Sequence, residues 1–222
     1  AIHLIGRGLA AAKGLKKKHA VKQVDRFLSN LGVDMWALFE HWVPYVIGPR
    51  PEVFVTMDWT EHDHDDQCTI ALNLITRHGR ATPLMWKTVV KSELKHKRNA
   101  YEDAILKRLA EVVPAGVKVT IVADRGFGDQ KLYKLMPELG FHYAIRFREN
   151  ITVTDDRDKS ATAADWVRPK GRVSMLKNVR VTTDLTPVPA VVLVRDPGMK
   201  EAWCIATDRT DLTARNVVKL YG

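Results

Sequence analysis

The stretch that decides the fold of this chain is VKVTIVADRGFGD, residues 117–129. Its first seven residues are rich in β-branched side chains and predict a strand, and Asp124 follows directly at the end of that strand. Gly126 and Gly128 then indicate a turn. A carboxylate at the end of a buried strand contributes little to a hydrophobic core. It is well placed, however, to hold a hard cation such as Mg²⁺ at the edge of a sheet.

A second stretch upstream has the same arrangement. The sequence VFVTMD, residues 53–58, also predicts a short strand that ends in an aspartate, Asp58. The alternative for both aspartates is an ordinary strand-end cap or a surface ion pair. A metal site needs the fold to bring these two distant positions together.

The elements between and after the two aspartates follow a regular order. Strand-like runs cover 53–58, 68–76 and 81–90, with residues 77–80 as the turn between the last two. Next come a helix at about 99–113, a strand at 117–123, a helix at about 129–139 and a strand at 141–147. This order is that of the ribonuclease H-like fold, an α/β architecture with a mixed sheet and flanking helices. Its first and fourth strands are neighbours, so Asp58 and Asp124 are expected to meet.

The segments on either side of this core, 51–150, differ from it. Residues 1–50 predict a helical segment, with a helix from about Asp34 to Val43 that Pro44 ends. The basic side chains of this segment include Lys16, Lys17 and Lys18. They form either a solvated face on a helical cap or a DNA-contacting surface; the second interpretation is slightly preferred.

Residues 151–207 predict a β-rich insertion. Strand-like runs lie at 172–175, 178–183, 188–195 and 202–207, separated in part by prolines at 187 and 189 and by Asp196-Pro197-Gly198. A last helix begins near Thr213, so that 208–222 is the start of a final core helix.

The composition favours an anionic partner. The 222 residues include 35 Lys and Arg against 26 Asp and Glu, a net charge of +9, which raises the odds of nucleic acid although many basic proteins bind none. No apolar run is long enough for a membrane helix and no signal peptide opens the chain. Cys68 and Cys204 lie singly in apolar runs, as reduced thiols do. We expect a cytoplasmic, nucleoid-associated protein with no membrane partner.

A histidine-rich run offers a remote alternative. His62-x-His64-x-Asp66 resembles the start of a metallo-β-lactamase zinc motif, and histidine is a good zinc ligand. That motif would need a further histidine where Gln67 stands. A zinc-dependent hydrolase is therefore disfavoured, and both histidines are expected in a polar loop beside the aspartates.

Three motifs carry a family resemblance. TMDWT (56–60), VADRGFGD (122–129) and YAIRFREN (143–150) resemble the IS4-type DDE transposases of bacterial insertion sequences, over roughly residues 20–222. The second motif is fairly specific, whereas Asp-Trp-Thr alone would be weak. The resemblance implies metal-dependent DNA cleavage and strand transfer at insertion-sequence ends. It assigns Asp58 and Asp124 as the first two of three acidic ligands for two ions, Mg²⁺ or Mn²⁺.

The third acidic ligand is the point of departure from the family. In the family a glutamate follows in a Tyr-x2-Arg-x3-Glu-x6-Lys pattern, and Tyr221 would begin that pattern one residue before Gly222. Glu201 lies in a turn region and is not assigned this role. We therefore expect a fragment that lacks the third ligand and is inactive by itself, with a non-catalytic DNA-binding remnant as the competing hypothesis.

The expected partner is double-stranded DNA, both transposon ends and target, bound by a homodimer. Arg146 and Arg148 alternate along a strand, so both could reach a phosphate. Arg125 could contact DNA or pair with a carboxylate. By the resemblance, a tryptophan near Trp203 stacks on a flipped base in relatives, although packing against the insertion is the preferred role here.

Overall fold

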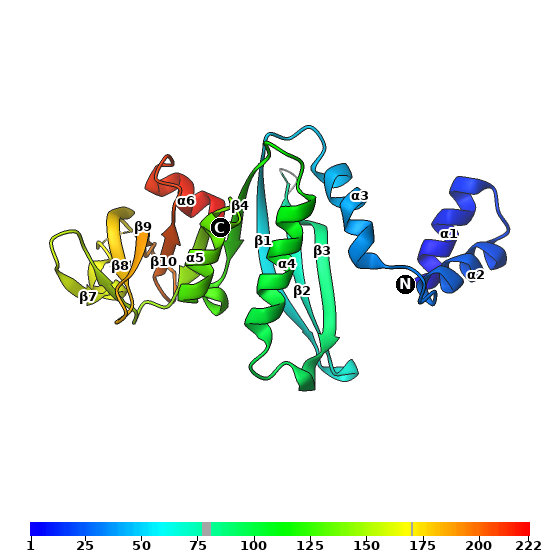
Figure 1. Cartoon of the computed structure of the whole chain (residues 1–222), viewed down its shortest axis with the longest axis horizontal. Coiled ribbons are helices and arrows are strands. Elements are labelled where there is room, and N and C mark those ends of the chain that lie inside the picture. Colours follow the sequence, from blue (N-terminus) through cyan, green and yellow to red (C-terminus); the bar gives the residue numbers. More distant parts are fainter. Residues whose placement is uncertain (77–80, 170) are drawn as a thin grey trace. The chain divides into compact units, whose positions relative to one another are not determined.

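A computed structural model describes residues 1–76, 81–169 and 171–222 (Figure 1). The turn expected at 77–80 lies outside the described residues. The chain divides into two compact units, Ala1–Glu40 and His41–Gly222, which are described separately.

The first unit is a pair of short helices, α1 (Ile2–Lys13) and α2 (Lys17–Leu28), joined through Gly14 in the left-handed conformation. The two helices touch closely at Gly6, where an added Cβ would lie 2.7 Å from the Cα of Val21. Ala10, Ala20 and Val24 are buried with Gly6. Several larger apolar side chains, including Phe27, Leu28 and Leu31, are exposed.

Helix α3 (Met35–Ile47) is longer than the sequence predicted. Pro44 was expected to end it, but the helix continues through Pro44, whose carbonyl accepts the amide of Gly48. Proline removes one helical hydrogen bond. Complete burial of Val43 and Ile47, on either side of that position, offsets the loss, at roughly 1.5–3 kcal/mol for each large apolar side chain.

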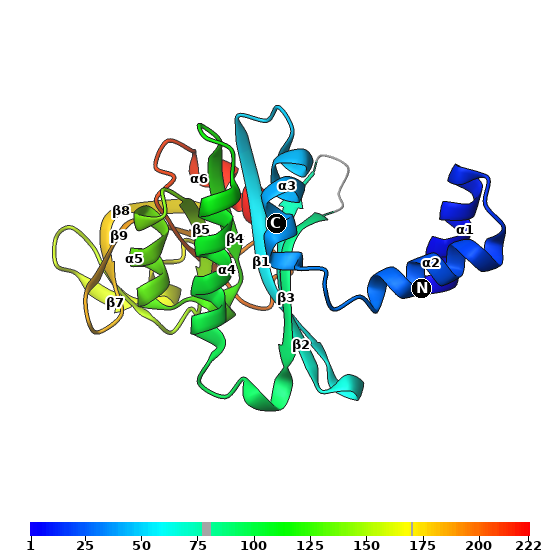
Figure 2. The same cartoon turned by 45° about the vertical axis from the view of Figure 1, so that its right-hand side comes forward.

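The core of the second unit begins with the predicted antiparallel meander. β1 (Glu52–His62), β2 (Gln67–Ile75) and β3 (Ala81–Val90) pair in sequence order. β4 (Lys118–Ala123) and β5 (His142–Phe147) then extend the sheet in parallel from the other side of β1. The helices α4 (Arg98–Val112) and α5 (Gln130–Glu138) connect these strands as predicted (Figures 1 and 2).

The sheet continues beyond β5. Among the described residues, ten strands form one sheet in the order β3-β2-β1-β4-β5-β10-β9-β8-β6-β7. β10 (Trp203–Thr207) pairs directly with β5, followed by β9 (Thr186–Val194) and β8 (Ser174–Val181). β6 (Thr152–Thr154) and β7 (Ser160–Thr162) form the far edge.

Two details of this extension correct the sequence prediction. The runs at 172–175 and 178–183 are one strand, β8, with Asn178 at φ 52° as a local irregularity. Pro187 and Pro189 lie inside β9 and do not separate strands. The pairing of β10 with β9 ends at Ala190, so this part of β9 pairs only with β8 and an absent N–H is tolerated there.

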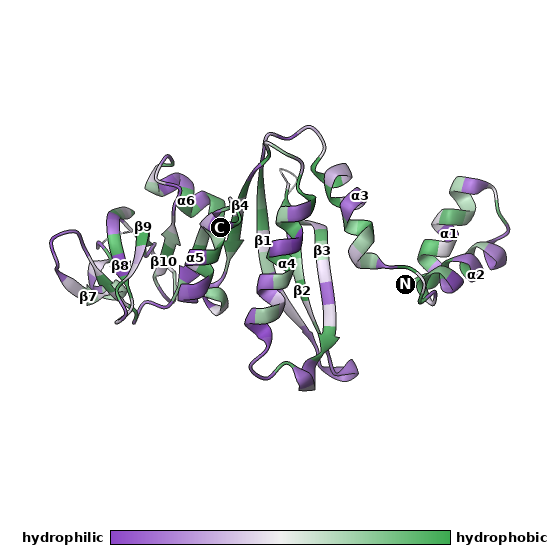
Figure 3. Ribbon diagram, in the orientation of Figure 1, coloured by the Kyte–Doolittle hydropathy of each residue, from purple (hydrophilic) through white to green (hydrophobic). Residues whose placement is uncertain are grey.

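The last helix, α6 (Ala214–Tyr221), begins near Thr213 as expected, and the Thr213 hydroxyl caps it by accepting the amide of Asn216. Val217 of α6 packs into a buried cluster with Ala144 of β5 and Ile205 of β10. Figure 3 shows this helix with mixed character and the central strands as largely hydrophobic. Within the described residues no helix is long and apolar enough to cross a membrane.

Candidate active site

The pairing of β1 with β4 brings the two predicted aspartates to one edge of the sheet. Met57 and Ala123 are register partners in these parallel strands, so Asp58 and Asp124 each come one residue later. The alternation of a strand sends neighbouring side chains to opposite faces. Trp59 bonds to α4, and Asp58 therefore points toward the face opposite α4.

Local hydrogen bonds orient both carboxylates. Asp58 Oδ1 accepts the amide of Trp59 at 2.8 Å, and Asp124 Oδ1 accepts the amide of Gly126 at 2.7 Å. Burial raises the pKa of Asp58; the Trp59 amide opposes this shift, and the negative charge of Asp124 adds to it. The two carboxylates thus repel each other electrostatically, and a cation between them would relieve that repulsion.

The chemistry of the donors fits a hard divalent cation. Two carboxylates at a strand edge provide the oxygen ligands that Mg²⁺ prefers, and Mg²⁺ keeps several waters, so two protein ligands are compatible with binding. Among the residues that the structure describes, no three His, Cys, Asp or Glu side chains are grouped to hold a metal ion.

The zinc alternative gains no support from the histidine-rich run. His64 lies in a 3-10 turn, Asp63–Asp65, that follows β1. The Asp66 carboxylate accepts the amide and hydroxyl of Ser92 at 3.1 and 2.7 Å, which engages the third residue of the proposed motif.

The arginine expected to contact either DNA or a carboxylate is paired with a carboxylate. Arg125 Nη1 lies 2.5 Å from Glu201 Oε2. Arg146 Nη2 reaches the same oxygen at 3.0 Å. The two guanidinium groups lower the pKa of Glu201, with Arg125 as the larger influence. Ala123 pairs with Ile145 across β4 and β5, which places Arg146 beside Asp124.

The other predicted DNA-binding residues of this unit have different surroundings. Arg148 is exposed and lies one residue past β5, so it does not share the strand with Arg146. Trp203 contacts Tyr221 edge-to-face, with ring centroids 5.0 Å apart. Its observed contact is therefore with α6. Burial raises the pKa of Tyr221, while the charge of Arg146 opposes that shift.

The three lysines predicted to bind DNA lie together at the start of α2. Lys16 is the N-cap residue without a side-chain cap bond, and Lys17 and Lys18 begin the helix, all three exposed. The positive end of a helix dipole disfavours cations. An external anion at this helix start would offset that unfavourable placement.

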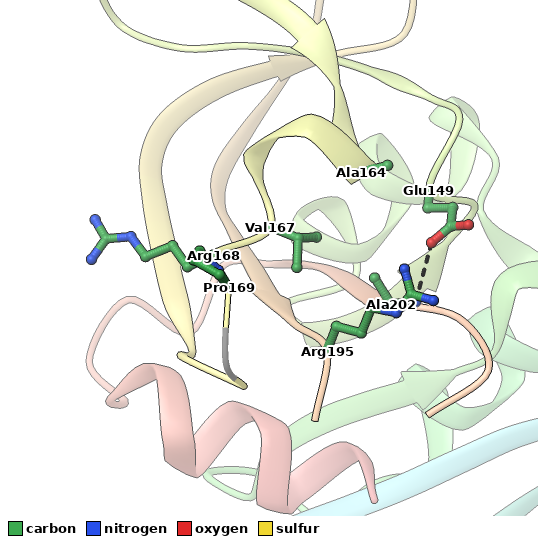
Figure 4. A pocket seen from close by; sticks show the side chains of 7 residues that line it. All are labelled: Glu149, Ala164, Val167, Arg168, Pro169, Arg195 and Ala202. Atoms are coloured by element: carbon green, nitrogen blue, oxygen red, sulfur yellow. Dashed lines mark hydrogen bonds between the residues drawn. The ribbon is translucent and has the colours of Figure 1, made fainter. Parts of the chain in front are cut away.

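A hollow of about 280 Å³ lies beside β10 (Figure 4). Glu149, Arg195 and Ala202 line it, together with residues from the 163–169 segment. Glu149 Oε2 accepts the amide of Ala202 at 3.1 Å, the dashed line in Figure 4, whereas Arg168 points away from Glu149. Neither Asp58 nor Asp124 lines the hollow. The hollow instead borders the backbone next to Glu201, at Ala202.

Glu201 is the site residue that sequence reasoning set aside. Its position before β10 gave no signal, because the antiparallel pairing of β10 with β5 cannot be read from a hydrophobic pattern. That pairing brings the Glu201 carboxylate to Arg125 and Arg146, 76 and 55 positions away.

Comparison with known proteins gives the family. The family described as transposase DDE domain matches residues 59–222, which include Asp124 and begin one residue after Asp58. No curated protein matched the chain. Two solved structures of Marinitoga piezophila Argonaute, one with guide RNA and one with guide RNA and target DNA, have TM-scores of 0.31 and 0.29.

These two structures are 11% and 10% identical to the chain, and each similarity covers 77% of it. The chain corresponds to a quarter of either Argonaute chain, because 25% of each is covered. The order of strands and helices is ribonuclease H-like. The match over most of its length shows that this chain belongs to the transposase DDE domain family.

Proposed function

We propose that this chain is the catalytic core of an insertion-sequence transposase of the IS4 type, which cleaves DNA and transfers a strand with the help of divalent metal ions. The observation that carries the proposal is the placement of Asp58 and Asp124 after the register partners Met57 and Ala123. The family membership supports the same chemistry, because DDE transposase domains use divalent metal ions.

Asp58 and Asp124 would hold the ions, Mg²⁺ or Mn²⁺, through their carboxylate oxygens. Ions held there would supply positive charge for the attacking oxygen and for the leaving 3′-oxygen of an in-line phosphodiester displacement. The aspartates contribute negative charge and fixed geometry, which the amides of Trp59 and Gly126 maintain. They need not act as general bases.

Basic side chains would position the DNA. Arg125 and Arg146 lie next to the aspartates, and Arg148 is exposed nearby in sequence, so each is a candidate phosphate contact. Lys16, Lys17 and Lys18 offer a separate cationic surface on the first unit. We propose double-stranded DNA as the substrate and a homodimer as the acting form.

A non-catalytic DNA-binding role is the second candidate. It is favoured by one observation: within the described residues, only two carboxylates meet at the strand edge and no third joins them. Both roles predict DNA binding, and only the first predicts cutting.

Nicking of DNA that carries the terminal inverted repeats separates the two roles. The assay uses the natural polypeptide that contains these residues, with Mg²⁺ or Mn²⁺. Cleavage that Asp58→Asn and Asp124→Asn each abolish would support the proposal. Cleavage that both variants retain would refute the metal-site assignment, and binding without cleavage would favour the second role.

A further inference from the structure

Arg125 and Arg146 form an anion site that is filled by a carboxylate of the same chain. We propose that the Glu201 carboxylate holds the position of a DNA phosphate, and that a phosphate beside the Asp58–Asp124 pair displaces it when DNA binds. This inference rests on the proposed function, because it assumes that DNA reaches this edge of the sheet. It adds to that function a carboxylate of the same chain, Glu201, that competes with DNA for the two arginines.

The geometry defines one point for the anion. Arg125 Nη1 and Arg146 Nη2 both bind Oε2 of Glu201, at 2.5 and 3.0 Å. Arginine forks match the geometry of phosphate and carboxylate oxygens equally well. The two arginines come from different elements, the turn after β4 and strand β5, so the point between them is set by the sheet.

The carboxylate leaves part of this donor capacity unused. Among the described residues, Arg146 Nε is one of two buried side-chain nitrogen or oxygen atoms with no hydrogen-bond partner. A buried donor without a partner is uncommon in a folded protein and calls for an explanation. Arg146 therefore retains one donor that neither the Glu201 carboxylate nor the Tyr221 side chain satisfies, as expected where a larger oxyanion is the intended partner.

The position of the anion point suits a bound DNA strand. Arg125 follows Asp124 directly, and Arg146 lies beside Asp124 because Ala123 and Ile145 are register partners. A phosphate between the two arginines would thus be a near neighbour of the carboxylate pair. Arginines there would hold the DNA backbone while the aspartates face the reacting group.

Glu201 is also built to be displaced. Its side chain is 45% exposed and that of Arg125 is 46% exposed, so this pair is screened by water and weak; Arg146, at 18% exposed, is the less screened of the two partners. The backbone at the next residue is fixed separately by the bond from the Ala202 amide to Glu149. The Glu201 side chain can therefore rotate away from the arginines while its strand stays in place.

The test compares Glu201→Gln with the parent chain, using a short fluorescein-labelled duplex in the presence of EDTA. Loss of the competing charge should tighten binding about three- to fivefold, the range that removal of one exposed ion pair allows. The gain should shrink as NaCl is added, because both anions are screened. Glu111→Gln is the matched control: it removes the same charge from an exposed side chain on α4 that is also paired with an arginine, Arg108.

A second set of variants tests whether the gain in DNA affinity depends on the two arginines. In a chain that carries Arg125→Gln and Arg146→Gln, Glu201→Gln should change the affinity no more than Glu111→Gln does. In the absence of DNA, inorganic phosphate should raise the melting temperature of Glu201→Gln more than that of the parent chain.

Three results would overturn the inference: affinity of Glu201→Gln no higher than that of Glu111→Gln, no added response to phosphate, or loss of folding. The last would make the ion pair a structural requirement. Because EDTA removes the metal, these outcomes are independent of cleavage. If Glu201→Gln gains no affinity but cleavage needs both aspartates, the anion-site inference is wrong and the proposed function remains supported. If Glu201→Gln gains affinity but cleavage does not need the aspartates, the anion site remains supported and the metal-site assignment is wrong.

Discussion

The indole Nε1 of Trp59 donates a hydrogen bond of 2.8 Å to the carboxylate of Glu102, which ties the residue after Asp58 to helix α4. Glu102 is only 8% exposed, and burial raises its pKa, a shift that the Trp59 bond opposes. A carboxyl group whose pKa is raised by folding lowers stability as pH rises through the interval above its ordinary pKa. The ionised form of Glu102 therefore lowers the stability of the folded chain at neutral pH.

Glu102→Gln is therefore expected to keep the acceptor for Trp59 and to remove the charge. Its free energy of unfolding at neutral pH should equal or exceed that of the parent, and the fall in stability with rising pH should flatten. Glu102→Ala should lose about 1–3 kcal/mol, because the indole N–H is left without its partner. Urea unfolding across the acidic range measures both, and destabilisation by Gln as large as by Ala would contradict the account.

Arg209 joins the start of β1 to the segment before α6. Its buried guanidinium donates to Glu52, to Thr120 and, through two nitrogens, to Asp211. Arg209→Met should cost about 1.5–3 kcal/mol of unfolding free energy, because it removes hydrogen bonds of a charged group whose carboxylate partners, Glu52 and Asp211, are 35% and 54% exposed. Arg209→Lys should recover only part of this, since an ammonium cannot reproduce the bidentate contact. Arg215→Met, at an exposed position of α6, is the control and should be nearly neutral.

The same network should be sensitive to acid. The hydrogen bond and charge of Arg209 lower the pKa of Asp211. A carboxyl group with a lowered pKa gives stability that is present above its unfolded pKa and is lost as pH falls toward the folded value. Asp211→Asn should remove that acid-labile part, so its stability should vary less than that of the parent below about pH 4.

Mg²⁺ is expected to stabilise the chain through the aspartate pair. Without metal, ionised Asp58 is disfavoured by burial and by Asp124, so Asp58→Asn should melt at the same or a slightly higher temperature than the parent. With Mg²⁺ the parent should gain stability in proportion to binding, and Asp58→Asn should gain little. An equal gain in stability with Mg²⁺ in the two proteins would show that Asp58 is not a metal ligand.

The sequence predicted the core well where local patterns determine it. The strand preceding Asp124 is buried along nearly its whole length, as a central parallel strand requires, and its apolar run indicated this directly. The order of elements then placed β1 beside β4. Prediction failed where distant packing decides: Pro44 remains helical because Val43 and Ile47 are buried, and Glu201 reaches the arginines only through the pairing of β10 with β5.

Substitutions of Trp203 distinguish a packing role of this residue from a role in DNA binding. Its edge-to-face contact with Tyr221 fixes α6 against β10. Trp203→Ala should destabilise the chain by about 3–5 kcal/mol, and Trp203→Phe should recover much of the loss because a ring remains in the contact. If the residue serves packing alone, Trp203→Phe should bind DNA like the parent. Weaker binding by a fully stable Trp203→Phe would instead assign the indole to the DNA.

The two glycines of α1 give a matched test of the first unit. A Cβ at Gly6 would lie 2.6 Å from Val21 Cγ2 and 2.7 Å from its Cα, whereas a Cβ at Gly8 meets nothing within 4 Å. Gly8→Ala should therefore stabilise the helix by about 0.5–1 kcal/mol through helix propensity. Gly6→Ala should separate α1 from α2 and lower the helical circular dichroism signal. If Lys16, Lys17 and Lys18 bind DNA from an intact α2, Gly6→Ala should also weaken DNA binding, and Gly8→Ala should not. Equal affinities for both variants would place the DNA surface elsewhere in the chain.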